Sequence, residues 1–209
     1  MAKPSLTQAT LDTYRHDLHA RHGQALAALL QPGESLEELS VARLSASVKA
    51  PPMRLLPKGS RIEDWGERAA RVQTAIDYAP GNAFFGVVGR LTSTRPSMTG
   101  GWDGEAGRFV ILVFAASRQK WTMERQFCLA RTNRRLVLLT APWTSGTRPF
   151  RLLTEYPSGS LVLNPDWKLR PGGNRVDVGF ADGSTLEFRA EFPAGALLAQ
   201  VLGSPVKLP

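Results

Sequence analysis

The second half of the chain is a succession of short apolar or alternating runs, and this pattern constrains the fold more than any other feature. Gly, Pro, Asn and Asp punctuate the runs, which is typical of antiparallel strands joined by turns. Asp182-Gly183 indicates a tight hairpin, because this pair tolerates positive φ angles and apolar residues alternate on both sides of it. The predicted strands are Ala83–Leu91, Arg108–Ala116, Met123–Arg131, Arg135–Ala141, Phe150–Tyr156, Ser160–Leu163, Arg175–Phe180 and Thr185–Ala190.

Helical spacing of apolar residues occurs on both sides of this region. Residues 5–30 are predicted to form a helix that Ser5 or Thr7 could cap, and residues 62–78 a second one. A short helix over Ala196–Leu202 is expected to close the fold. The remaining expectations are a first strand over Glu34–Leu44, a surface loop over 45–61 and a Gly-rich loop over 100–107 that joins two strands.

These elements predict one domain of the α+β class that is mainly β. We expect an antiparallel small barrel or sandwich of about seven strands, capped by the C-terminal helix. We also expect an additional N-terminal helix before this domain and a helical insertion within it.

One segment of the sequence resembles a motif of a known family. Phe127 to Leu139 reads FCLARTNRRLVLL, and its Thr-Asn-Arg-Arg-Leu resembles the strand–turn–strand core of bacterial PH-like (GRAM-like) domains. Leu30 to Glu34 resembles the family's Leu-x-Pro-Gly-Glu before the first strand, and the Asp182-Gly183 hairpin and the last helix resemble its closing elements. The resemblance implies a PH-like domain over 31–203 with an insertion at about 45–82, preceded by the 1–30 helix and followed by a tail over 204–209. It also implies a binding or scaffolding role, for phosphoinositides in some members and for proteins in many.

The cysteine content and the apolar runs bear on location. The single cysteine, Cys128, excludes an internal disulfide and lies in an apolar run that predicts a buried, inert thiol. The N-terminus lacks a signal-peptide pattern, and no apolar stretch approaches the ~20 residues of a membrane span. We therefore expect a cytoplasmic protein, and peripheral binding at the inner membrane remains open.

The positive charge is concentrated in one segment. Between Arg90 and Arg175 there are 14 Lys or Arg and 5 Asp or Glu, whereas the rest of the chain has 12 and 13, so the net charge of +8 arises here. One interpretation is a coding bias toward arginine with dispersed solubilising charge. The other is recognition of an anionic partner, because guanidinium groups suit phosphate and carboxylate. The candidate anion-binding residues are Arg118, Lys120, Arg148, Arg134 and Arg135, with the first three expected at one rim and the Arg134 turn at the opposite one.

Catalytic and metal-binding patterns are weak. His16, His19 and His22 would share a helix face roughly 120° wide, and His16 with His19 is a weak metal candidate beside a solvated polar face. No nucleophile elbow or phosphate-binding loop occurs, and no histidine outside the first helix could serve Cys128 as a base. We therefore expect no enzyme activity and no cofactor.

Three functions remain as hypotheses. The first is a non-enzymatic PH-like module that binds or scaffolds a protein partner. The second is peripheral binding of anionic lipid headgroups through an arginine-rich rim. The third is nucleic-acid binding through the basic 90–175 segment, which predicts a steep loss of affinity with salt.

Overall fold

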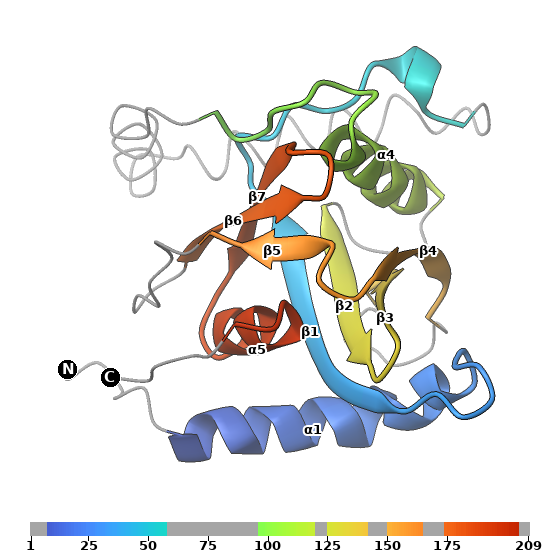
Figure 1. Ribbon diagram of the computed structural model, residues 1–209, viewed down its shortest axis with the longest axis vertical. Helices are drawn as coiled ribbons and strands as arrows, with labels where there is room; N and C mark the ends of the chain where they lie inside the picture. Colours follow the sequence, from blue (N-terminus) through green and yellow to red (C-terminus); the bar gives the residue numbers. More distant parts are fainter. Residues whose placement is uncertain (1–7, 58–95, 120–124, 142–149, 165–173, 205–209) are drawn as a thin grey trace.

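The protein is built on one antiparallel sheet (Figure 1). The computed structural model describes residues 8–57, 96–119, 125–141, 150–164 and 174–204. The described elements are α1 (Gln8–Ala27), β1 (Leu36–Leu44), η1 (Met53–Leu55), α4 (Glu105–Arg118), β2 (Gln126–Thr132), β3 (Arg135–Leu139), β4 (Leu152–Pro157), β5 (Leu161–Leu163), β6 (Asn174–Phe180), β7 (Thr185–Ala190) and α5 (Ala194–Val201). The seven described strands follow the order β4-β3-β2-β1-β7-β6-β5. The predicted class, mainly β with about seven antiparallel strands and a C-terminal helix, is confirmed.

Strand β1 joins the two halves of the sheet. It pairs with β2 along nearly its whole length, whereas only its last two residues, Arg43 and Leu44, pair with β7. The sheet turns over at this junction, so that β5–β7 face β2–β4. The two halves touch where the rings of Tyr156 on β4 and Phe180 on β6 lie 6.2 Å apart.

Aromatic rings fill the space between the two halves. Phe109 of α4 is fully buried at their centre, 5.0 Å from Phe127, 5.1 Å from Phe188, 5.9 Å from Phe180 and 6.3 Å from Tyr156, measured between ring centroids. Two of these pairs, with Phe127 and Phe180, are edge-to-face, an arrangement that adds to the stabilisation from burying the rings. Helix α4 therefore closes one end of the sheet interior with its own apolar face.

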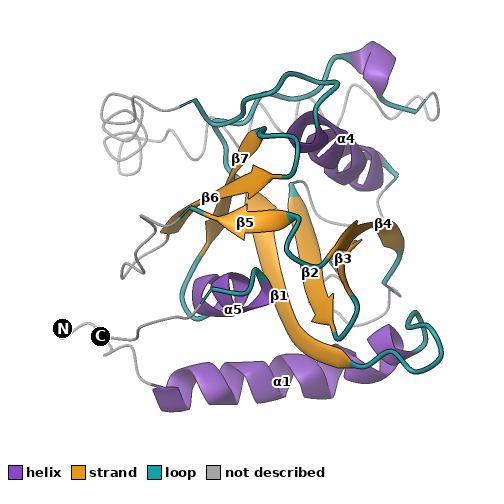
Figure 2. Ribbon diagram, viewed as in Figure 1, coloured by secondary structure: helices purple, strands orange, loops and turns teal. Residues whose placement is uncertain are grey.

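A second apolar cluster covers the outer face of β1, β2 and β3. Figure 2 shows α1 and α5 at the end of the molecule opposite α4. Leu11, Leu18 and Leu26 of α1 and Ala196 and Leu197 of α5 pack there against the sheet. Leu198 and Val201, on another side of α5, belong to the inner core instead. Because α5 is buried on two sides, it connects the clusters, which explains why six of its eight residues are buried.

The prediction of a strand over Arg108–Ala116 is wrong, because this segment lies in the helix α4. After Arg108 the run contains five β-branched or aromatic residues and no polar interruption, a composition that favours a strand. A short apolar run does not distinguish a strand from a buried helix by its periodicity alone. Tertiary contacts decide the outcome here, since the buried residues of the helix form one continuous face. They are Ala106, Gly107, Phe109, Val110, Val113, Phe114 and Ala116.

The prediction that residues 100–107 form a loop between two strands is also wrong, because this segment opens α4. The N-cap residue, Gly104, has no side chain to cap the helix. The β6–β7 turn supplies the cap instead: Asp182 Oδ2 accepts the N–H of Glu105 at 2.7 Å, and Ser184 Oγ accepts that of Ala106 at 3.0 Å. A side-chain acceptor at these positions satisfies the unpaired N–H groups of a first turn. A Cβ on Gly107 would overlap the backbone of Trp102, so the glycine allows this close packing.

Two predicted elements, the helix over 62–78 and the strand over Ala83–Leu91, lie outside the described residues. The predicted N-terminal helix over 5–30 corresponds to α1, and the predicted first strand over Glu34–Leu44 to β1. Since β1 and β2 are paired neighbours, the whole of 45–125 lies between adjacent strands. This connection contains α4, and the predicted insertion at about 45–82 falls within it and stays a prediction.

Candidate binding surfaces

The turn between β2 and β3 is organised by Thr132 and Asn133. Thr132 Oγ1 accepts the backbone N–H groups of Arg134 at 3.2 Å and Arg135 at 3.0 Å. Asn133 donates its backbone N–H to the carbonyl of Ser35 at 3.1 Å, and its Oδ1 accepts the N–H of Ser35 at 3.0 Å. Side chains of this kind stabilise turns by binding nearby backbone groups. The loop before β1 and the β2–β3 turn therefore lie side by side.

Arg135 lies in an ion-pair triad. Its Nε and Nη2 donate to the two carboxylate oxygens of Glu34, each at 2.7 Å, and its Nη1 contacts Glu155 of β4. Glu34 is fully covered and also accepts hydrogen bonds from the Gln31 N–H at 2.8 Å and the Thr132 hydroxyl at 2.7 Å. The bond from Arg135 holds the pKa of Glu34 at about 2. The two carboxylates thus occupy the guanidinium of Arg135, a predicted anion-binding group that is only 11% exposed.

The other two arginines of this turn differ in their surroundings. Arg131 donates from Nε to Glu37 at 3.0 Å and from Nη1 to the carbonyl of Gln200 in α5 at 2.6 Å. Arg134 is exposed, and its guanidinium lies over the backbone of Gly33. Of the two predicted anion-binding residues in this turn, Arg134 is therefore the one that faces solvent.

Arg118 lies at the C-terminal end of α4. Figure 1 shows this helix and the β2–β3 turn at opposite ends of the molecule, as the sequence predicted for Arg118 and the Arg134 turn. Arg118 ends this helix, however, and does not lie in a turn between two strands, as the predicted strands 108–116 and 123–131 implied. Lys120 and Arg148 lie outside the described residues, so the rim that would join them to Arg118 stays a prediction.

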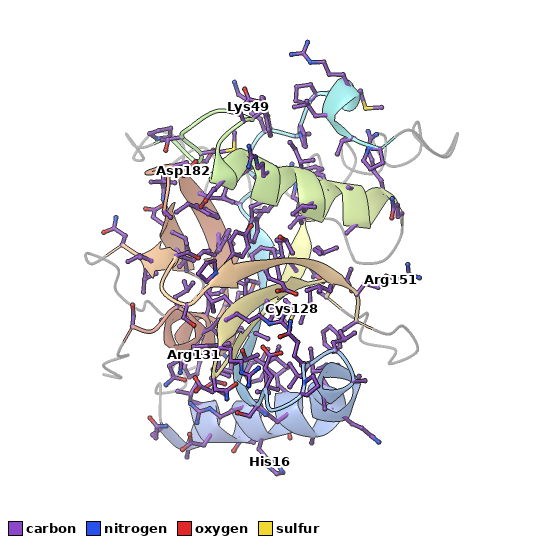
Figure 3. All side chains as sticks on the ribbon, turned by 45° about the vertical axis from the view of Figure 1, so that its right-hand side comes forward. His16, Lys49, Cys128, Arg131, Arg151 and Asp182 are labelled. Atoms are coloured by element: carbon purple, nitrogen blue, oxygen red, sulfur yellow. The ribbon has the colours of Figure 1, made fainter. Side chains whose placement is uncertain are left out.

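In the structure Arg118 lies next to a segment that is distant in sequence and contains basic and apolar residues. The Nη2 of Arg118 donates to Met53 Sδ at 2.6 Å, and Met53 is 44% exposed on the single turn η1. Arg54 and Lys49 in the same segment are also exposed (Lys49 is labelled in Figure 3). Sequence reasoning treated this segment as a surface loop. An available signal was the Met-Arg-Leu-Leu run enclosed by prolines, which is unusually apolar for a loop.

Arg125 has a structural role near this end. Its Nη1 donates to the carbonyls of Ser45 at 2.8 Å and Val48 at 3.1 Å, and its guanidinium lies 5.4 Å from the centre of the Phe114 ring. Arg125 also has a φ of 60°, which is uncommon for a residue with a side chain. It therefore ties the segment after β1 to the start of β2, across the insertion.

The three histidines do not converge. His16 is exposed and points away from the sheet in Figure 3, whereas His19 Nε2 lies 3.8 Å from Glu38 Oε1 and His22 packs edge-on against Phe150 at 5.2 Å. Burial, and secondarily the charge of Arg21, lowers the pKa of His22. The expected solvated histidine face is therefore correct for His16 and wrong for His22. Within the residues that the structure describes, no group of three His, Cys, Asp or Glu could hold a metal ion.

Comparison with known proteins gives no relative. No family model matches the chain, and neither a curated protein nor a solved structure shows significant similarity to it. Among the described helices, none is long and apolar enough to cross a bilayer. The described surfaces and their chemistry are accordingly the basis for a functional proposal.

Proposed function

We propose that this chain is a non-enzymatic binding module of the PH-like kind, whose partner is another protein that binds along the free edge of β4. The PH-like part of the proposal is supported by the seven-stranded antiparallel sheet, the C-terminal helix on β1 and the Thr-Asn-Arg-Arg-Leu turn. The binding part is supported by the exposed edge of the described sheet at β4.

The observation that carries the choice of partner is the position of β4 at the edge of the sheet that the described strands form. Strand β4 is the last strand in the described sheet order and pairs there with β3 alone. An edge strand presents unpaired backbone N–H and C=O groups, and an extended segment of another protein can add to it as a further strand. Leu152 on this strand is 43% exposed, which provides one apolar anchor beside the backbone groups.

β4 lacks two of the features that protect edge strands, although a register shift between Leu138 and Leu139 interrupts its pairing with β3. It has no lysine, and its one proline, Pro157, is its last residue. Arg151, which projects away from the body in Figure 3, precedes the strand and adds a positive charge at its start. A partner segment that pairs with this edge would therefore combine backbone hydrogen bonds with an apolar contact at Leu152.

The test is affinity capture from native lysate at two salt concentrations, comparing the wild-type chain with Leu152→Lys. The matched control is Val162→Lys, because Val162 is 56% exposed on β5, the edge strand at the other end of the sheet. We expect one protein to co-purify with the wild-type chain in stoichiometric amount and to stay bound at high salt. It should no longer co-purify with Leu152→Lys, but should still co-purify with Val162→Lys. Equal loss with both variants would refute the β4 site, and recovery of lipid or nucleic acid only at low salt would refute a protein partner.

A second candidate, binding to an anionic membrane surface, is favoured by one observation. The exposed Met53 lies against Arg118 and beside Arg54, and apolar side chains surrounded by cations suit the headgroup region of anionic bilayers. Sedimentation with phosphatidylserine vesicles tests it. Charge reversal at Arg118 and Arg54 should abolish pelleting, while Arg21→Glu on α1, at the far end of the molecule, should leave it unchanged. Unchanged pelleting in the double variant would refute this candidate.

A further inference from the structure

Helix α1 covers an apolar sheet face that would otherwise be open. It runs across the outer side of β1, β2 and β3, next to α5 (Figure 2). The covered side chains include Leu39, Cys128, Ala130, Val137 and Leu139, each at most 4% exposed. Cross-strand pairing places Cys128 beside Leu139 and Ala130 beside Val137, so the face is continuous.

The apolar contribution of α1 itself is small. Of its 20 residues, only Leu11, Leu18 and Leu26 are buried. Its first turn has no acidic residue and its last turn no basic one, so the helix dipole is not compensated at either end. Three buried leucines and the partly buried Tyr14 are little to offset the conformational entropy of ordering a helix of this length. Elements with few buried contacts are those that open locally while the rest of a protein stays folded.

One polar cluster defines how α1 is placed. Glu38 of β1 is buried at 5% exposure, and its Oε2 accepts a hydrogen bond from Arg15 Nε at 2.9 Å. Arg15 also donates from Nη2 to Gln200 Oε1 of α5 at 2.7 Å, and His19 Nε2 lies 3.8 Å from Glu38 Oε1. A buried carboxylate is costly without a cation beside it. Any helix that occupies this face must therefore present a basic side chain to Glu38.

We propose that α1 is a reversible cover, and that the face beneath it is a binding site for an amphipathic, basic helix of a partner protein. The occupant would carry apolar residues at the spacing of Leu11, Leu18 and Leu26 and a cation at the position of Arg15, four residues after the first of them. α1 shows that a helix with this leucine spacing and one cation opposite Glu38 fits, although its own two arginines are balanced by two aspartates. The carboxylate of Glu38 selects against acidic helices. This site is separate from the β4 edge and does not depend on it.

The opening of α1 can be measured through Cys128, the only cysteine of the chain. Its thiol is fully buried in the cluster under α1, so a thiol reagent reacts only when the cover opens. We expect the labelling rate of the wild-type chain to be nearly independent of urea at low concentrations, because local opening exposes little surface. A rate that rises with urea as steeply as global unfolding does would overturn the reversible cover.

A matched pair of substitutions separates local from global opening. Leu18→Ala removes an anchor of α1, whereas Leu186→Ala removes a buried leucine from the inner core. We expect Leu18→Ala to raise the labelling rate at least about tenfold. Leu186→Ala should leave the urea-independent part of the rate within about twofold of wild type. Equal acceleration by both substitutions would contradict local opening of α1.

The binding site is tested with a fluorescent synthetic peptide of residues 8–30, added to the full-length chain. We expect saturable binding with one peptide per chain, at least about tenfold tighter to the Leu18→Ala chain than to wild type, because its own α1 competes less. Bound peptide should also slow the labelling of Cys128. An Arg15→Glu peptide should bind at least about tenfold more weakly, and a Glu38→Arg chain should reverse this preference. Failure of the wild-type peptide to bind the Leu18→Ala chain, or indifference to the charge at position 15, would overturn the site.

Discussion

Replacing Glu34 by glutamine tests the triad that joins the loop before β1, the β2–β3 turn and β4. The carboxylate of Glu34 is fully covered, and both of its oxygens accept hydrogen bonds from Arg135 at 2.7 Å. A glutamine has the same size but carries no charge and offers a single acceptor oxygen, so the bidentate contact is lost. The guanidinium of Arg135, only 11% exposed, then keeps Glu155 as its carboxylate partner.

The expected magnitude follows from the pKa of Glu34. Its reduction from 4.5 to about 2 corresponds to about 3 kcal/mol of folding free energy at neutral pH. Because Glu155, the other carboxylate on Arg135, is 42% exposed, solvent screening lowers the contribution to about 2 kcal/mol. Glu34→Gln should therefore destabilise the protein by about 2 kcal/mol at pH 7.

The lowered pKa of Glu34 also predicts how the stabilisation by this residue changes with pH. A carboxylate whose pKa is lower in the folded state stabilises that state fully above its unfolded pKa, here 4.5, and loses this contribution as the pH falls toward 2. Urea unfolding of the wild-type and Glu34→Gln chains at pH 7 and pH 3 measures it. We expect the difference between the two chains to shrink to less than half at pH 3.

A control substitution measures the stability lost when an exposed ion pair is removed. Glu37→Gln removes the partner of Arg131, but Glu37 is 43% exposed, so its loss should cost less than about 1 kcal/mol. If Glu34→Gln cost no more than Glu37→Gln, or if the loss at Glu34 were the same at pH 7 and pH 3, the reasoning about the buried triad would be refuted.

Three further substitutions test other parts of the fold by urea unfolding. Ser184→Ala should cost about 1 kcal/mol, because Ser184 caps α4 from the β6–β7 turn; no loss would mean that the cap is dispensable. Gly107→Ala, which would stabilise an ordinary helix, should instead destabilise this one by about 3 kcal/mol through overlap with the backbone of Trp102; a stabilised variant would contradict that close approach. Because burial lowers the pKa of His22, protonation favours the unfolded state, so wild type should lose more stability than His22→Gln as the pH falls from 7 to 5; parallel losses would argue against a buried neutral imidazole.

Much of the sheet was predictable because its signals are local. Strands β3, β6 and β7 begin and end within two residues of their predictions, and Gly183, with a φ of 80°, forms the expected tight turn. The Thr132-Asn133 turn was likewise visible from its side chains, which bind nearby backbone groups. In each case alternation and turn chemistry lie within a few consecutive residues.

The candidate sites were less predictable, because a charge has no function until its neighbours are known. Arg134 and Arg135 are adjacent in sequence, yet one faces solvent and the other is occupied by Glu34 and Glu155, which are distant along the chain. Met53 and Arg118 meet although 65 residues separate them. The edge of β4 could not be identified either, since strand order follows from pairing and not from the sequence of a single strand.

Helix α4 shows most clearly which part of the fold the sequence alone could not predict. By itself the sequence determined an antiparallel sheet with a C-terminal helix, because period-two alternation and turn residues act over short distances. Only the tertiary structure decided that the apolar run after Gly107 is a helix. Its cap comes from Asp182 and Ser184, and its apolar face is matched by rings from β2, β4, β6 and β7. Those partners are assembled only when the sheet has formed, and their packing then outweighs the local preference of the run for a strand.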